Sequence, residues 1–213
     1  MARPENTAER REQILDGLMR VIARKGYAAA TTAAVAKAAK LAPGLIHYHF
    51  ESKQELLLAL LERLSALLEA RRRERLSAGD DDGPWAQVDA FIDACLALDA
   101  KADPLAVACW TALSAEAIGN PEVGAQYRKV VHRHAQLLQE AVLGVLALTP
   151  GEDEARRHRA REASATLLGA IYGCFQLAAA APGTLPTGAA AANVRAMARG
   201  LLGPGATPPS RSA

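Results

Sequence analysis

The chain has 213 residues, a length that allows one medium domain or a small domain followed by a larger one. Hydrophobic residues make up 50% of it and aromatic residues only 4%, because alanine and leucine are abundant. This bias, with almost none of the Val, Ile and Thr alternation of strands, favours an all-helical protein and argues against a sheet. No basic-then-apolar leader follows Met1, so we expect a cytoplasmic protein.

The formal net charge of +2 is distributed unevenly. Residues 1–50 carry eight Lys and Arg against four Asp and Glu, whereas residues 51–213 carry seventeen against nineteen. A basic N-terminal part is what attraction to phosphate would require, although such a small excess also falls within ordinary surface variation.

The first predicted helix covers residues 7–25. Apolar residues recur along it at helical spacing, and Gly26 follows it as a stop. Three arginines near its start could touch a nucleic-acid backbone or could equally be solvated; these are Arg3, Arg10 and Arg11.

Two short helices joined by a tight turn are predicted next, over residues 31–39 and 43–49. Thr31 and Thr32 are good N-caps for the first helix, and Pro43 suits the first turn of the second. The residues of the second helix that then face outward are Pro43, Gly44, His47 and Tyr48. A short, rigid helix with polar and aromatic groups outward and few acids fits a DNA major groove.

A longer helix is predicted to follow at once, from Ser52 to about Leu76. Ser52 and Glu55 stand at capping-box spacing, which satisfies free N–H groups at the helix start. Lys53 therefore lies in the first turn, where N–H groups and the helix dipole favour an anion such as phosphate. A capped surface helix with an exposed lysine is the plainer alternative for this motif.

This part of the chain resembles the tetracycline-repressor (TetR) type transcriptional regulators. The matching stretches are Gly26-Tyr27, Thr31–Ala39, Gly44–Phe50 and Ser52–Leu57. The resemblance implies a helix-turn-helix DNA-binding domain over residues 1–51. It also implies a C-terminal effector-binding and dimerisation domain over residues 52–203.

Two residues depart from the family pattern. Lys40 stands where the turn usually has glycine, and Ala42 stands where serine commonly caps the second helix. We expect Lys40 to adopt a positive φ at some cost, and Pro43 to take over part of the capping role. These departures bear on base preference and not on the fold.

We therefore expect helix 43–49 of each subunit of a homodimer to enter the major groove of a palindromic double-stranded DNA operator. Gly44, which has no side chain, would let the backbone of the helix come close to the DNA, whereas Lys53 would bind a phosphate. The residues expected to contact DNA are Thr31, Thr32, Ala42, Pro43, Gly44, His47, Tyr48, His49 and Lys53.

The remainder of the chain is predicted to be helical, with a polar loop at 77–83 and a disordered tail at 204–213. Proline near the first position marks three of the helix starts. The predicted helices are 84–101, 104–118, 121–148, 150–181 and 187–202, which brings the total to about nine.

Between Ala163 and Val194 there is not one charged residue. A membrane hairpin is the first alternative, but Pro182 and Pro186 interrupt the run, so no membrane contact is expected. Small residues in this run permit close helix approach, and a two-fold dimer is the commonest way to cover such a face. The resemblance likewise implies a homodimer formed by the last two helices of each subunit.

The resemblance also implies that residues 84–181 enclose a pocket for a small-molecule effector. The segment 110–121 is similar to the choline-responsive, BetI-like branch of the family, in which case Glu116 could pair with a cationic ligand and Trp110 could give a cation–π contact. Glu116 could equally pair with Arg128 or Lys129. The candidate ligand-binding residues, each of which could instead be plain core, are Trp85, Phe91, Cys95, Trp110, Leu113, Glu116, Tyr127, Tyr172 and Phe175.

Catalysis has little support in the sequence. The three cysteines lie in apolar helical runs and are expected to be buried reduced thiols. No phosphate loop, nucleophile elbow or paired-cysteine metal pattern occurs, so no catalytic residue, metal or cofactor is expected. The sequence thus predicts a ligand-responsive repressor and not an enzyme. Two other classes stay open: a small-molecule-binding protein or enzyme without DNA affinity, and a helical scaffold that acts through protein contacts.

Overall fold

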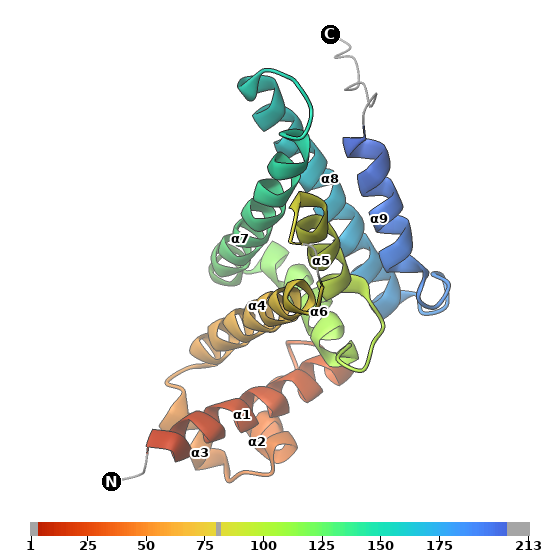
Figure 1. Cartoon of the computed structure of the whole chain (residues 1–213). Coiled ribbons are helices and arrows are strands. Elements are labelled where there is room, and N and C mark those ends of the chain that lie inside the picture. Colours follow the sequence, from red (N-terminus) through yellow and green to blue (C-terminus); the bar gives the residue numbers. More distant parts are fainter. Residues whose placement is uncertain (1–3, 80–81, 204–213) are drawn as a thin grey trace. The chain divides into compact units, whose positions relative to one another are not determined.

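The computed structural model describes residues 4–79 and 82–203, and within these ranges the chain is all-helical, with nine helices and no strand (Figure 1). The helices are α1 (Pro4–Lys25), α2 (Thr32–Ala39), α3 (Pro43–His49), α4 (Lys53–Ala78), α5 (Pro84–Leu96), α6 (Pro104–Gly119), α7 (Pro121–Leu146), α8 (Asp153–Ala180) and α9 (Ala189–Leu202). The expected fold class and the order of helices are confirmed. The predicted tail at 204–213 lies outside the described residues.

The chain divides into two compact units. Among the described residues, the first contains residues 4–66 together with Asp103–Val130, and the second contains residues 67–79, 82–102 and 131–203. Helices α4 and α7 therefore each contribute residues to both units. The assignment of separate functions to 1–51 and 52–203 stays a prediction.

In the first unit, α1 packs against α2, α3 and α6. The approach of α1 to α2 is close at Gly17, where an added Cβ atom would lie 2.8 Å from the Cβ of Ala39 and 2.9 Å from the carbonyl oxygen of Val35. Space, and not backbone conformation, therefore requires glycine at this position. An ion pair also joins α4 to α1: the Arg63 guanidinium pairs with Asp16 at 2.6 Å.

The turn between α2 and α3 has a left-handed residue at Lys40, with φ 57° and ψ 42°. The Lys40 N–H donates to the carbonyl groups of Ala36 and Lys37 at the end of α2. The predicted positive φ is thus confirmed. A residue with a Cβ atom in this conformation carries a strain of about 1–2 kcal/mol that glycine would avoid.

In the second unit, α5 packs against α8 and α9, and α8 packs against α9. Apolar side chains from α5, α7, α8 and α9 form its core. Fully covered members of this core are Val88, Phe91, Ile92, Leu138, Val142, Leu167, Ile171 and Val194.

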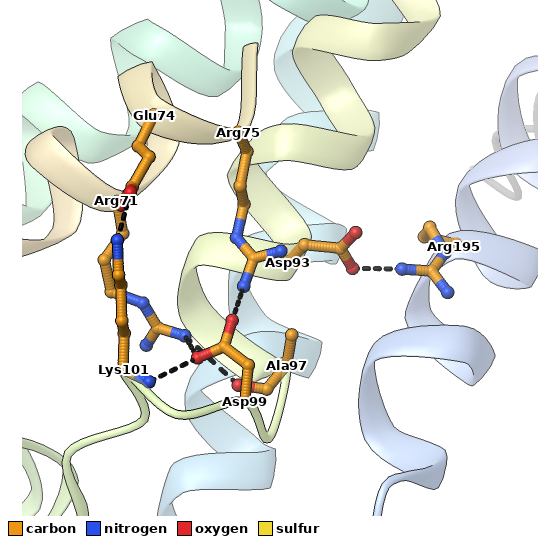
Figure 2. A network of polar contacts seen from close by, with 8 residues as sticks. All are labelled: Arg71, Glu74, Arg75, Asp93, Ala97, Asp99, Lys101 and Arg195. Atoms are coloured by element: carbon orange, nitrogen blue, oxygen red, sulfur yellow. Dashed lines mark hydrogen bonds and ion pairs between the residues drawn. The ribbon is translucent and has the colours of Figure 1, made fainter. Parts of the chain in front are cut away.

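Asp99 lies in the loop after α5 and joins it to the second half of α4 (Figure 2). Its carboxylate pairs with Arg71 at 3.2 Å and with Arg75, and it accepts the backbone N–H of Lys101 at 2.9 Å. Burial opposes the charged form, but the Lys101 hydrogen bond and the two arginines outweigh it and lower the pKa of Asp99. α5 ends at Leu96, and not at residue 101 as the sequence predicts, because Ala97 is already extended (φ −70°, ψ 130°); Arg71 donates to the carbonyl oxygen of Ala97 at 3.1 Å.

Two further ion pairs connect α5 to α9 within this unit. Asp93 pairs with Arg195, as Figure 2 shows, and Asp89 pairs with Arg199 at 2.5 Å. The Arg199 guanidinium also lies 3.7 Å from the centroid of the Trp85 ring, which is a cation–π distance. These charged contacts join α9 to α5 in addition to apolar packing.

α8 is long and apolar enough, by length and composition alone, to cross a membrane, yet only 28% of its apolar 18-residue window is buried inside the chain. Exposed, uncharged residues form one stripe on α8 and a second stripe on α9, which we call the α8–α9 face. Its members are Ala165, Thr166, Gly169, Gly173, Gln176, Leu177 and Ala180 on α8, and Ala192, Asn193, Ala196, Met197 and Gly200 on α9. A Cβ atom on Gly169 or Gly173 would meet no described atom within 4 Å.

Candidate functional site

Helices α2 and α3 form the two-helix element that the sequence predicts. Thr31 caps α2, because its Oγ1 accepts the N–H of Ala34 at 3.1 Å, whereas Thr32 is the first residue of the helix. α3 begins at Pro43 and is preceded by Ala42, whose methyl group cannot cap it. The fixed φ of proline thus starts the helix in place of a side-chain cap, as expected.

The outward side of α3 is exposed. Ile46 is 1% exposed, whereas Tyr48 is 71% exposed, and Pro43, Gly44 and His47 are exposed with it. A Cβ atom on Gly44 would meet no atom of the described chain within 4 Å. The helix therefore presents a bare patch of backbone beside polar and aromatic groups, and another backbone can approach it closely.

The start of α4 carries the predicted capping box. The N–H of Glu55 donates to Ser52 Oγ at 3.0 Å, and Glu55 Oε2 accepts the N–H of Glu51 at 2.8 Å. The second bond goes to Glu51 and not to Ser52, one residue earlier than expected. Lys53, in the first turn, donates from Nζ to the carbonyl oxygen of Tyr27 at 3.1 Å and lies 4.1 Å from the centroid of its ring. Since an ammonium group has three donors, this contact leaves two for a phosphate.

His49 is half-buried at the end of α3. Burial, followed by the charges of Arg11 and Arg10, lowers the pKa of His49 from its ordinary value of 6.5. The imidazole is therefore mostly neutral at pH 7 and could hydrogen-bond a phosphate without forming an ion pair with it. Its ring meets that of Tyr48 edge to face at 5.0 Å.

Arg11, which the sequence predicts to be either solvated or in contact with a nucleic-acid backbone, makes several contacts within the chain. Its guanidinium turns inward, where it donates to the carbonyl oxygen of His49 and pairs with Glu55 at 3.2 Å. It also lies 4.0 Å from the centroid of the Phe50 ring. Sequence reasoning missed these contacts because they join residues far apart in the chain.

Three of the candidate ligand-binding residues lie together in the second unit. Phe91 lies edge to face with His134 at 6.4 Å, the Nδ1 of His134 is 3.1 Å from the hydroxyl oxygen of Tyr172, and the ring of Tyr172 stacks on Phe175 at 6.0 Å. His134 is 2% exposed, and burial lowers its pKa to about 4. Sequence reasoning missed this histidine as a member of an aromatic cluster.

Four other candidates lie in the first unit. Trp110 and Tyr127 are tilted against each other at 5.0 Å, and burial raises the pKa of Tyr127 to about 12. Glu116 accepts a hydrogen bond from Asn120 at 3.4 Å. Within the described residues it forms no ion pair with Arg128 or Lys129, so that alternative is wrong for this structure. The fourth candidate, Leu113, is fully buried.

The candidate set is therefore divided between two aromatic groups in different units. Trp85 packs against the core of the second unit, and the Arg199 guanidinium lies over its ring. Cys95 is buried in the core of the second unit, and burial raises the pKa of its thiol to about 12. Cys109 is also buried, whereas Cys174 is half-buried, and all three thiols are free. The prediction of buried reduced thiols is thus confirmed for Cys95 and Cys109.

Comparison with known proteins gives consistent results. Residues 14–60 match the family model of bacterial regulatory proteins, tetR family. The HTH-type transcriptional regulator BetI of Rhizobium meliloti (strain 1021) is 31% identical over 164 residues, which cover 76% of this chain and 76% of that protein. The fold is similar to that of a transcriptional regulator from Rhodococcus sp. Rha1, with a TM-score of 0.72 and 24% identity, over 90% of this chain and 95% of the other. It is also similar to a protein from Saccharomonospora viridis in complex with choline, with a TM-score of 0.69 and 22% identity, over 90% of this chain and 94% of the other.

Proposed function

Because the chain belongs to the TetR family of DNA-binding transcriptional regulators, we propose that it is a cytoplasmic repressor that binds a palindromic operator as a homodimer and is released by a small molecule. The exposed outward side of α3, with its bare patch of backbone at Gly44, is the observation that carries this proposal. Within residues 4–79 and 82–203 this surface is exposed, and it suits a major groove.

The DNA contacts divide into two kinds. Pro43 and His47 would lie near base edges and provide sequence preference, since both are exposed on the outward side of α3. Tyr48, His49 and Lys53 would contact phosphates, together with the hydroxyl groups of the threonines at the start of α2. Phosphate contacts orient the protein on the duplex but carry no sequence information.

The α8–α9 face supports a homodimer. It is exposed, uncharged and lined with small residues, and Gly169 and Gly173 leave open space on α8. A second copy of the same face covers such a surface by two-fold symmetry, and the four helices can approach closely. A dimer would also hold two copies of α3 at the spacing of about 34–36 Å that successive major grooves require.

The effector would act by binding more tightly to a state of the dimer in which the two α3 helices have a different spacing. A ligand shifts such an equilibrium only if it binds the two states with different affinity. Trp110 and Tyr127 offer two adjacent aromatic rings, which suit an organic cation, and Glu116 lies further along the helix that carries Trp110. Because one similar structure contains choline, choline is the first effector to test.

Selection from a duplex library with a randomised centre, followed by a gel shift on the recovered sequence, tests DNA recognition. We expect a two-fold symmetric sequence to be enriched and choline, or another small cation, to release it. Recovery of no duplex even in dilute buffer would contradict the proposal, and turnover of a ligand without DNA affinity would favour an enzyme.

Sedimentation with two matched variants tests the dimer. Gly169→Arg places a large charged side chain on the α8–α9 face, so we expect a monomer with greatly weakened operator binding. Gly119→Arg is the control, because a Cβ atom at that exposed glycine of α6 also meets no described atom within 4 Å. If both variants remain dimeric, the α8–α9 face is not the interface.

A further inference from the structure

Side chains of α1 reach the C-terminal ends of both helices of the two-helix element. Gln13 Nε2 donates to the carbonyl oxygen of Ala39 at 2.8 Å, and Arg20 Nη2 donates to that of Ala38 at 3.0 Å, both at the end of α2. Arg11 donates to the carbonyl oxygen of His49, the last residue of α3. The last carbonyl groups of a helix lack partners within it and carry partial negative charge. α1 therefore supplies the missing donors, two of them cationic.

The contacts of Arg11 extend beyond this carbonyl group. We call the set formed by Arg11, His49, Phe50 and Glu55 the Arg11 clamp. The guanidinium lies over the Phe50 ring, and its Nη2 pairs with Glu55 Oε1, while the other oxygen of Glu55 caps α4 through the N–H of Glu51. One side chain of α1 thus contacts the end of α3, the residue after it and the first turn of α4.

α3 has few other anchors. It has seven residues, too few for a helix to be stable by itself in water. Of its residues, all of which the structure describes, Ile46 alone is buried. The direction of such a helix depends on the groups that hold its ends, and its N-terminal end lacks a side-chain cap at Ala42.

We propose that Arg11 is a positioning residue, which fixes the direction of α3 from behind and does not itself contact DNA. This inference rests on the proposed function, because it assigns a role to Arg11 in operator recognition. The Arg11 charge is balanced by Glu55, and its guanidinium already donates to His49. A phosphate-binding arginine would instead keep the N–H donors of its planar guanidinium available for an anion.

Three variants separate positioning from phosphate contact, measured as operator affinity over a series of salt concentrations. Arg11→Lys keeps the charge but loses the geometry that serves several partners, so we expect affinity to fall about tenfold with an unchanged salt dependence. If Arg11 contacted a phosphate, Arg11→Lys would keep most of the operator affinity. Arg11→Ala would then make the slope of log affinity against log salt shallower. Arg24→Ala, at an exposed arginine of the same helix, is the control.

Glu55→Gln gives a test in which the two roles predict opposite signs. Glutamine preserves the capping box, and removal of a negative charge near DNA would by itself strengthen binding. If Glu55 holds Arg11 in place, operator affinity falls instead. Stronger or unchanged binding by Glu55→Gln, together with full activity of Arg11→Lys, would overturn the proposal.

A measurement without DNA keeps this inference distinct from the proposed function. The Arg11 charge contributes to the lowered pKa of His49, so Arg11→Ala should raise that pKa in an NMR titration of the folded chain. Faster amide exchange in α3, with exchange in α8 unchanged, is expected in the same variant. If wild-type protein binds no DNA, the proposed function fails whatever these values are. If it binds DNA but neither value changes, the clamp is absent in solution and the inference fails.

Discussion

Gly17 of α1 and Ala39 of α2 lie so close that a Cβ atom on the glycine would be 2.8 Å from the Cβ atom of the alanine. The backbone nitrogen of Ala39 and the carbonyl oxygen of Val35 would be equally crowded, at 2.9 Å. Since two of these three atoms belong to the backbone, the clash cannot be relieved by a side-chain rotation. α1 and α2 can therefore pack at this distance only with glycine at position 17.

Gly17→Ala should accordingly destabilise the protein by about 1–3 kcal/mol, although alanine favours helices. Chemical denaturation measures this loss, and Gly44→Ala is its control because that position is open. A neutral or stabilising Gly17→Ala would show that α1 and α2 are further apart than described.

Lys40→Gly should act in the opposite direction. Lys40 has φ 57°, and glycine adopts this left-handed conformation without steric cost. Part of the gain is offset by the greater freedom of glycine in the unfolded chain, so we expect about 0.5–1 kcal/mol of added stability. Lys37→Gly, three residues earlier and inside α2, should destabilise the protein and serves as the control. A lower melting temperature for Lys40→Gly would contradict the expectation.

Gly44→Ala should separate stability from DNA binding. An added methyl group meets no described atom, so the free energy of unfolding should stay unchanged or rise slightly. The same methyl group would stand between α3 and a DNA backbone, so operator affinity should fall about tenfold or more. Equal affinity in a gel shift would mean that this patch does not approach DNA.

Lys53→Ala should weaken binding to all duplex sequences alike. If its ammonium contacts a phosphate, the slope of log affinity against log salt should become shallower by about one unit for each lysine lost. Fluorescence anisotropy at several salt concentrations measures the slope. An unchanged slope would remove Lys53 from the phosphate contacts and leave it as a partner of Tyr27.

Acid should destabilise the second unit through His134. Its pKa is lowered to about 4 by burial and, secondarily, by the charge of Arg133, whereas the unfolded value is about 6.5. The unfolded chain therefore binds more protons between these two values, so stability is complete above pH 6.5 and is lost as the pH falls towards 4. The loss should amount to about 3 kcal/mol at the lower end.

The variant His134→Gln removes this titration while glutamine can still hydrogen-bond Tyr172. Its stability should depend less on pH between 6.5 and 4 than that of the wild type. His132→Gln, at an exposed histidine, is the control and should keep the wild-type pH profile. Parallel pH profiles for all three proteins would show that His134 is accessible to protons in the folded state.

Helix order and most helix ends could be predicted because their signals are local. Pro43 and Ser52 mark helix starts through their own backbone and side-chain chemistry, whatever the rest of the chain does. The Arg11 clamp could not be predicted, since Arg11 and Glu55 are 44 residues apart and no periodicity relates them. For the same reason the candidate ligand-binding residues could be recognised as large side chains, but not assigned to separate groups.

The contact between Lys53 and Tyr27 has a consequence for the energetics of recognition. A lysine that is free in solution loses much of its rotational freedom when it binds an anion, which costs up to about 2 kcal/mol. In this chain the bond to the Tyr27 carbonyl oxygen and the ring beneath the ammonium group already restrict the side chain before any duplex is present. That entropy is therefore lost during folding, so the proposed contact of Lys53 with a phosphate would cost less entropy during association.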